Sequence, residues 1–241
     1  MNIEKQKIRE EIWRKMEEKG IAVFPGAYGR IPNFVGAEEA AEKLAQLSIW
    51  KEANIIKVNP DSPQKPVRRN ALNEGKILIM PTPRISSGFL MLDPRRIDKK
   101  NYDYACTIKG AFKYGVEIKP ENLQKIDLVV VGSVAVNIFG DRIGKGEGYS
   151  EIEWGIVSEY GKVNDKTPIV TTVHDIQIVD YKFKIDPYDV PVDIIITPTK
   201  IITTNRVREK PKGIYWELMD GEKIQKISLL KEMYNRINRR N

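Results

Sequence analysis

The sequence contains one cysteine, Cys106, and one histidine, His174, among its 241 residues. A single thiol excludes an internal disulfide and a thiolate metal cluster, so we expect a reducing, cytoplasmic environment. The longest apolar run, 128–136, contains Gly132 and Ser133 and falls well short of the roughly 18 residues that a membrane span needs. The charged, amphipathic N-terminus is unlike a secretory signal. These features argue against the membrane, secreted and disulfide-scaffold classes.

Charge, by contrast, is plentiful and unevenly placed. Lys and Arg number 40 against 33 Asp and Glu, a net charge of +7. Residues 206–241 hold ten basic and five acidic side chains, so 10 − 5 = +5 of the excess lies in the last 36 residues. This basic segment suits either a solvated helix or a surface that attracts phosphates, and an RNA partner is one form of the second interpretation.

Periodicity predicts an α/β fold with a mainly parallel, Rossmann-like sheet flanked by helices. Helices are expected from the N-terminus to Gly20, over 37–53, from about Ser150, and over 227–237. Short apolar runs, each bounded by polar or helical segments, are expected as buried parallel strands: 55–58, 77–80, 128–131, 169–173 and 192–196. Residues 1–205 are expected to form one α/β domain, and 206–241 a basic connector and helix packed on it.

Several predicted strands end at polar or glycine-containing loops, at 59–62, 81–84 and 132–133. In open α/β sheets, ligands bind where the carboxyl ends of strands gather, so one site is expected at this edge.

The segment 140–153, with the sequence GDRIGKGEGYSEIE, carries the most chemical information. Gly144, Gly146 and Gly148 alternate with charged residues, which lets consecutive backbone N–H groups approach an anion. Arg142 and Lys145 add positive charge, and the helix that follows would direct its positive end at the same place. A dinucleotide fingerprint would need Gly at Tyr149, and a P-loop would need Ser or Thr after its lysine, so neither motif is present.

Taken in order along the chain, these residues resemble the 5-formyltetrahydrofolate cyclo-ligase family. The resemblance lies in Lys5-Gln-Lys-Ile-Arg9, the segment 75–81, Arg142-Ile-Gly-Lys-Gly-Glu-Gly-Tyr-Ser-Glu151, Gln177 and the segment 188–193. The runs 30–34, 81–84, 129–136, 144–149 and 173–177 are more similar still to the methenyltetrahydrofolate synthetase domain-containing subgroup.

The resemblance implies a cyclo-ligase fold and an ATP- and Mg²⁺-dependent enzyme acting on 5-formyltetrahydrofolate or a related pterin. It implies that Arg142 and Lys145 act in catalysis and that Glu151 binds Mg²⁺. ATP contacts are implied for the residues at matching positions: Lys5, Arg9, Gly144, Gly146, Glu147, Gly148, Tyr149 and Asp189.

Other interpretations stay open for individual residues. Lys5 and Arg9 could form a solvated helix face, Glu151 could favour a helix N-terminus, and Asp189 could be a turn residue. Arg30 and Arg84 are candidates for a folate glutamate tail, and Asp61 for the pteridine. His174 is more readily structural, and Asp193 could be a strand-entry residue. A nucleotide- or RNA-binding module without ligase activity, or an ATP-dependent enzyme on another one-carbon substrate, are the alternative functions.

Overall fold

The computed structural model describes residues 3–239 and contains an eight-stranded sheet beside a three-stranded one. The strands are β1 (Ile55–Val58), β2 (Ile77–Pro81), β3 (Phe89–Leu92), β4 (Val116–Ile118), β5 (Leu128–Val131), β6 (Ala135–Asn137), β7 (Arg142–Ile143), β8 (Ile169–Thr172), β9 (Ile178–Val179), β10 (Ile194–Ile196) and β11 (Ile201–Thr203). The α-helices are α1 (Ile3–Glu18), α2 (Ala37–Gln46), α3 (Ser48–Glu52), α4 (Lys65–Asn73), α5 (Tyr102–Ala105), α6 (Ile108–Tyr114), α7 (Tyr149–Glu159), α8 (Gly221–Lys226) and α9 (Ser228–Asn238).

The large sheet runs in the order β11-β10-β8-β5-β1-β2-β3-β4. Its five central strands, β10, β8, β5, β1 and β2, are parallel, and antiparallel strands complete both edges. The five parallel strands are the five that the apolar runs predict, so the mainly parallel sheet is confirmed. Parallel strands are covered on both faces, which explains why these runs are apolar rather than alternating.

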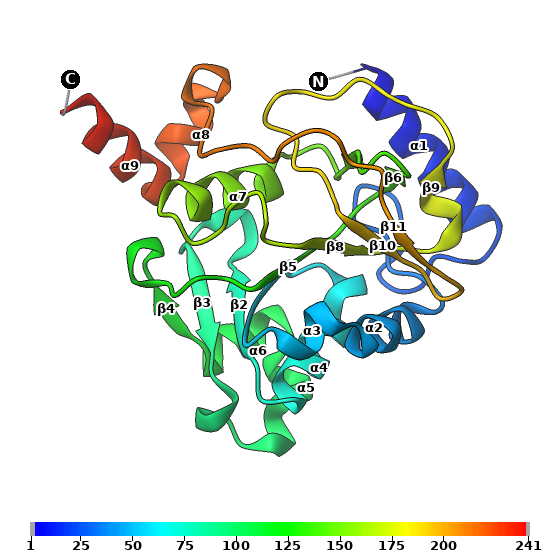
Figure 1. Ribbon diagram of the computed structural model, residues 1–241, viewed down its shortest axis with the longest axis horizontal. Helices are drawn as coiled ribbons and strands as arrows, with labels where there is room; N and C mark the ends of the chain where they lie inside the picture. Colours follow the sequence, from blue (N-terminus) through cyan, green and yellow to red (C-terminus); the bar gives the residue numbers. More distant parts are fainter. Residues whose placement is uncertain (1–2, 240–241) are drawn as a thin grey trace.

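Two apolar clusters cover the two faces of the sheet, and successive strand residues alternate between them. Leu128 and Val130 of β5 point into one cluster with α1, α2 and α4, whereas Val129 and Val131 point into the other with α7 and α9. Figure 1 shows α2 to α6 on one side of the sheet and α7 to α9 on the other. The result is a three-layer arrangement with the parallel strands at its centre.

The predicted helix over 37–53 is wrong in one respect, because it is broken at Leu47. This residue is extended (φ −72°, ψ 147°) and separates α2 from α3. The break turns Trp50 into the core, where its ring is fully buried and its Nε1 donates a hydrogen bond of 2.7 Å to Oε2 of Glu74. Ala40 and Leu44 face inward as expected.

The C-terminal part of the chain differs from expectation in its details. The predicted helix over 227–237 is present as α9, but Ile227 is extended and a further helix, α8, precedes it. Asp220 caps α8 by accepting a hydrogen bond of 3.0 Å from the N–H of Glu222. The apolar residues of α9 join the α7 side of the core through Leu230 and Met233.

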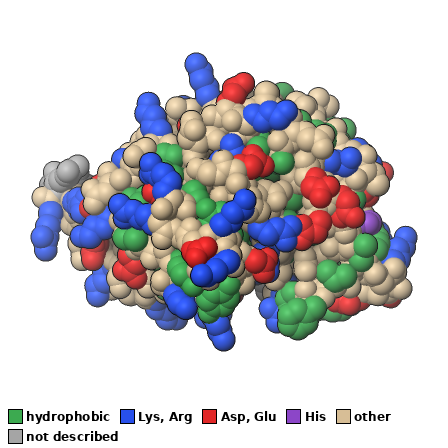
Figure 2. All heavy atoms as spheres, turned by 90° about the horizontal axis from the view of Figure 1, so that it is seen from below, with side chains coloured by type: hydrophobic (Ala, Val, Ile, Leu, Met, Phe, Trp, Pro, Cys, Tyr) green, Lys and Arg blue, Asp and Glu red, His purple; other side chains and the backbone are tan. Residues whose placement is uncertain are grey.

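No helix within residues 3–239 is long and apolar enough to cross a bilayer. Figure 2 shows Lys and Arg side chains dispersed over one face of the molecule, with Asp and Glu side chains between them. The RNA partner stays a prediction, and this face adds no continuous basic patch in its favour.

Candidate functional site

The glycine loop joins β7 to α7 and has the backbone that its glycines permit. Gly146 (φ 104°) and Gly148 (φ 73°) occupy the left-handed region, which other residues rarely enter. Gly148 is the N-cap of α7, so the helix begins at Tyr149, one residue before the predicted start. The first turn of α7 thus directs its unpaired N–H groups at the loop.

Arg142 and Glu151 meet at the centre of the site. The Arg142 guanidinium is buried, donates a hydrogen bond of 2.8 Å from Nη1 to the carbonyl of Gly132, and forms a short ion pair from Nη2 to Glu151 Oε1. Its Nε finds no hydrogen-bond partner within residues 3–239. The residue lines a cavity, so its positive charge lies next to the space that an anionic ligand would occupy.

The first helix, α1, brings two further cations to the same place. Arg9 is 5% exposed, and its Nε donates a hydrogen bond of 2.7 Å to the carbonyl of Gly144. The guanidinium also packs against Gly146, where a Cβ would lie 3.3 Å from Arg9 Cζ. The solvated-face interpretation of α1 is therefore wrong for Arg9, which contacts the loop directly.

Lys5 lies one turn earlier on α1 and is equally buried. Its Nζ forms ion pairs with Asp186, at 2.9 Å, and with Asp189. Burial acts to lower the pKa of Lys5, but the hydrogen bonds and charges of the two aspartates outweigh it and hold the pKa above its usual value of 10.5. Lys5 is therefore a permanent cation at the edge of the site.

These groups line one cavity of about 410 Å³. Its walls include most of the residues predicted to bind ATP, together with Arg142 and Glu151: Lys5, Arg9, Gly144, Gly146, Glu147, Gly148 and Asp189. A volume of this size lies within the range of about 300–1,000 Å³ typical of small-molecule sites. We call it the cationic cavity.

A second cavity, of about 280 Å³, lies on the other side of the glycine loop. It is lined by the polar loops that follow β1 and β2, as the strand-edge argument predicts, and by Arg30, Asp61 and Arg84. Lys145 and Tyr149 line this cavity and not the first, whereas Gly144, Glu147, Gly148 and Glu151 line both. We call it the strand-edge cavity.

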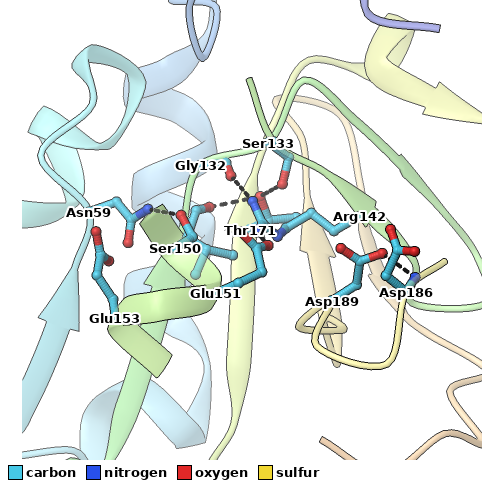
Figure 3. Close-up of polar contacts among 12 residues, drawn as sticks. Asn59, Gly132, Ser133, Arg142, Ser150, Glu151, Glu153, Thr171, Asp186 and Asp189 are labelled. Carbon is cyan, nitrogen blue, oxygen red and sulfur yellow. Dashed lines mark hydrogen bonds and ion pairs between the residues drawn. The ribbon is translucent and has the colours of Figure 1, made fainter. Parts of the chain in front are cut away.

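Figure 3 shows the residues at the boundary between the two cavities. Arg142 and Glu151 lie between Asp186 and Asp189 on one side and Asn59, Ser150 and Glu153 on the other.

Glu147 is the acidic residue within the glycine loop, and it pairs with cations of the strand-edge cavity. Its carboxylate lies 2.7 Å from Lys145 Nζ and 3.7 Å from Arg84 Nη2. Both cations therefore have a counter-ion that an anionic ligand would have to displace.

Asp61 is held in the strand-edge cavity by a buried arginine. Arg68 donates to the carbonyls of Asn59 and, at 3.0 Å, of Asp61, and so fixes the loop after β1. Burial raises the pKa of the Asp61 carboxyl, against the lowering effect of Lys145, Arg68 and Arg142. The Asp61 carboxyl lines this cavity, where its oxygens can accept hydrogen bonds from a ligand.

A buried ion pair beneath this cavity was not predicted. Lys57 in the centre of β1 and Glu153 in α7 are almost fully buried, with Nζ and Oε2 2.6 Å apart. Lys57 also donates to Asn59 Oδ1 at 3.1 Å, and Asn59 donates to Ser150 Oγ at 2.8 Å. A lysine inside an otherwise apolar strand is the signal that could have found this network.

Two of the considered residues lie outside both cavities. His174 Nδ1 accepts a hydrogen bond of 3.2 Å from the N–H of Ile176, a capping role. Asp193 pairs with Arg206 and Lys210 at 2.8 and 2.7 Å and accepts from the N–H of Ile169. Both positions support the structural interpretation.

The carboxylates of the cationic cavity suit Mg²⁺ only in part. Glu151 and Asp189 are oxygen donors on its wall, but within residues 3–239 no group of three or more acidic, His or Cys side chains could hold a metal alone. Mg²⁺ bound to nucleotide phosphates needs only one or two protein carboxylates, so the residues present fit that mode of binding.

Comparison with known proteins places this geometry in a family. Residues 2–198 match the family model of the 5-formyltetrahydrofolate cyclo-ligase family. The chain is 42% identical over 235 residues to a methenyltetrahydrofolate synthase domain-containing protein of Bos taurus, covering 96% of this chain and 62% of the relative. The Mus musculus protein of the same name is 42% identical over 238 residues, with 97% and 64% covered. The chain thus spans about three fifths of the length of these relatives.

Among solved structures, the chain resembles Aquifex aeolicus 5,10-methenyltetrahydrofolate synthetase. The TM-score is 0.53 at 19% identity, covering 86% of this chain and 96% of that one. This likeness confirms the cyclo-ligase type of α/β fold.

Proposed function

Because the chain belongs to the 5-formyltetrahydrofolate cyclo-ligase family, we propose that it converts 5-formyltetrahydrofolate, or a related reduced pterin, to the 5,10-methenyl form at the expense of ATP. The observation that carries the proposal is one glycine loop that lines both a cationic cavity and a strand-edge cavity. Such a loop can hold a phosphoryl donor on one side and its acceptor on the other.

The reaction asks the protein mainly for positioning and for charge stabilisation. The formyl oxygen attacks the γ-phosphorus and ADP departs; the N10 amine then attacks the activated carbon and loses its proton as phosphate leaves with the oxygen. In this proposal the triphosphate lies in the cationic cavity. There Arg9, Arg142 and the backbone N–H groups of 144–148 neutralise its charge, with Lys5 at the edge.

The pterin lies in the strand-edge cavity, where Asp61 offers a carboxyl to the ring nitrogens. Arg30 and Arg84 stand on the same wall for a glutamate carboxylate. Lys145 faces this cavity beside the loop, where it can stabilise the transferring phosphoryl group once the contact with Glu147 is exchanged for substrate.

Glu151 and Asp189 are the residues that would hold Mg²⁺ on the phosphates. The ion supplies charge neutralisation during phosphoryl transfer. Glu151 also holds the Arg142 guanidinium in place through their ion pair.

The proposal is tested with the purified full chain, Mg-ATP and 5-formyltetrahydrofolate, by following the absorbance of the methenyl product. We expect Arg142→Ala to lower turnover by about 100-fold or more, as loss of a charge-stabilising donor does. Arg9→Met is expected to raise the KM for ATP, whereas Arg14→Met, on the exposed face of the same helix, leaves it unchanged.

Thermal melting shows whether each variant is folded. Product formation that survives in folded Arg142→Ala would contradict the assigned site. If the wild-type protein binds ATP but makes no methenyl product, the proposed substrate is wrong and the proposed nucleotide site still stands.

A further inference from the structure

The last part of the chain lies outside the family match, which ends at residue 198. It nevertheless forms one wall of the cationic cavity. The lining residues from this part are Gly213, Ile214, Tyr215, Leu218, Met219, Asp220 and Lys223. The alignment with the Bos taurus relative spans 235 residues, so it must extend well into this part of the chain.

This wall is fixed to α7, the helix that follows the glycine loop. Trp154 Nε1 donates a hydrogen bond of 2.8 Å to the carbonyl of Pro211, and the N–H of Gly213 donates to Ser158 Oγ at 3.1 Å. Gly155 allows the close approach, because a Cβ there would lie 2.9 Å from Cγ1 of Ile214. In Figure 1 this segment runs past α7 before it enters α8.

Lys223 of α8 connects the wall to the glycine loop itself. Its Nζ forms a short hydrogen bond to the carbonyl of Glu147 and lies 5.3 Å from the centroid of the Tyr149 ring. Through these two contacts, with the Glu147 carbonyl and the Tyr149 ring, Lys223 holds the glycine loop against α8.

The two sources of the cavity wall differ in chemistry. Helix α1 and strand β7 supply the cations Lys5, Arg9 and Arg142, whereas the C-terminal wall supplies, besides Lys223, the apolar side chains of Ile214, Leu218 and Met219. A ligand that suits both has a polyanionic part joined to a flat, largely apolar part, which is the composition of a nucleoside triphosphate.

We propose that residues 213–223 form the nucleoside-binding wall of the ATP site, with Met219 in contact with the base and Lys223 as a positioning residue for the glycine loop. This inference rests on the proposed function and deepens it, since it assigns ATP recognition in part to residues beyond the family match.

Calorimetric titration of the full chain with ATP, and competition by inorganic tripolyphosphate, test the proposal. Met219→Ala is expected to weaken ATP binding about tenfold, in line with the loss of about 1.4 kcal/mol of apolar contact, while tripolyphosphate affinity stays unchanged. The control is Val207→Ala, a C-terminal residue that is 98% exposed and lines neither cavity.

Lys223→Met is expected to weaken ATP and tripolyphosphate alike, with a larger rise in KM than fall in kcat, and Lys223→Arg to restore most of the loss. The control is Lys226→Met on the same helix, whose ammonium pairs with Glu222 at the surface.

The contact between Met219 and the base would be overturned if Met219→Ala lost ATP and tripolyphosphate affinity equally, or lost no ATP affinity. It would also be overturned if tripolyphosphate did not compete with ATP for the wild-type protein.

A wild-type chain that binds no ATP would overturn the proposed function together with this inference. If the wild type binds ATP and the Met219 and Lys223 variants bind it equally well, this inference alone is overturned.

Discussion

At the scale of single residues, the carboxyl groups of the site differ in how closely a cation approaches them. Burial raises the pKa of both Glu153 and Asp61. Glu153 has a close ion pair of 2.6 Å with Lys57, whereas Lys145, Arg68 and Arg142 oppose the raised pKa of Asp61 through their charge. Burial of a carboxyl group without a close ion pair is expected to cost stability, and such groups are frequent in binding sites.

Asp61→Asn is therefore expected to stabilise the protein at neutral pH. The folded protein holds the Asp61 proton more tightly than the unfolded chain, so the stability from this group is present below pH 3.8 and lost as pH rises through the raised pKa. The amide removes that loss, and the melting temperature at pH 7 should rise by about 2–4 °C for each kcal/mol relieved.

The measurement is thermal melting of wild type and variant from pH 3 to 8, with exposed Asp180→Asn as control. The difference should vanish at the acidic end. A gain that persists unchanged at pH 3, or a less stable variant at pH 7, would contradict the burial argument.

Which of these residues could be predicted follows from their place in the sequence. Arg142 and the segment Gly144 to Gly148 are adjacent, so their pattern predicts an anion-binding loop from the sequence alone. Lys57 and Glu153 are 96 positions apart, and no local pattern indicates which acid faces a lone lysine in a strand. Burying one partner without the other would cost several kcal/mol, roughly 3–5, which explains why the pair is found together.

At the scale of elements, close packing against α7 positions the C-terminal segment. Gly155 is inside α7, where an exposed glycine would favour replacement by alanine by about 1 kcal/mol. Here the added methyl group would meet Ile214 at 2.9 Å and the Gly213 carbonyl at 3.1 Å.

Gly155→Ala is expected to destabilise the protein by about 1–3 kcal/mol, as overpacking does. Displacement of residues 213–214 should also weaken ATP binding. Urea denaturation and ATP titration measure the two effects. The matched control is Gly221→Ala at the start of α8, where a Cβ would meet nothing within 4 Å. A more stable Gly155→Ala would show that the segment is free to move away.

Burial alone did not decide which strands could be predicted, because β3 is largely buried and apolar and was nevertheless missed. The five central strands have apolar runs that are recognisable in the sequence. The edge strands β4 and β11 do not, because Val116 of β4 is 49% exposed and β11 has an exposed residue at each end. Strands β6, β7 and β9 have only two or three residues, too few to show a period. The break at Leu47 escaped prediction because the apolar spacing continues through it.

At the scale of the whole molecule, the question is whether residues 206–239 fold with the body. We propose that they do, since Leu230 is fully buried in the cluster that contains α7. Leu230→Ala should then lower the stability of the entire protein by about 2–5 kcal/mol in one transition.

We would follow urea unfolding of the wild type and Leu230→Ala by tryptophan fluorescence and by circular dichroism. Lys231→Ala, at an exposed position, is the control. Coincident curves that shift together are expected. A separate early transition, with the main transition unmoved, would make the C-terminal part an independent unit.

The shared glycine loop has a thermodynamic consequence. Gly144, Glu147, Gly148 and Glu151 line both cavities, so a ligand that orders the loop from one side changes the free energy of binding on the other. Such coupling is reciprocal: the factor by which nucleotide tightens pterin binding must equal the factor by which pterin tightens nucleotide binding. A loop ordered by both partners would therefore favour the ternary complex over either binary one, and ATP would be held most firmly when its acceptor is already in place.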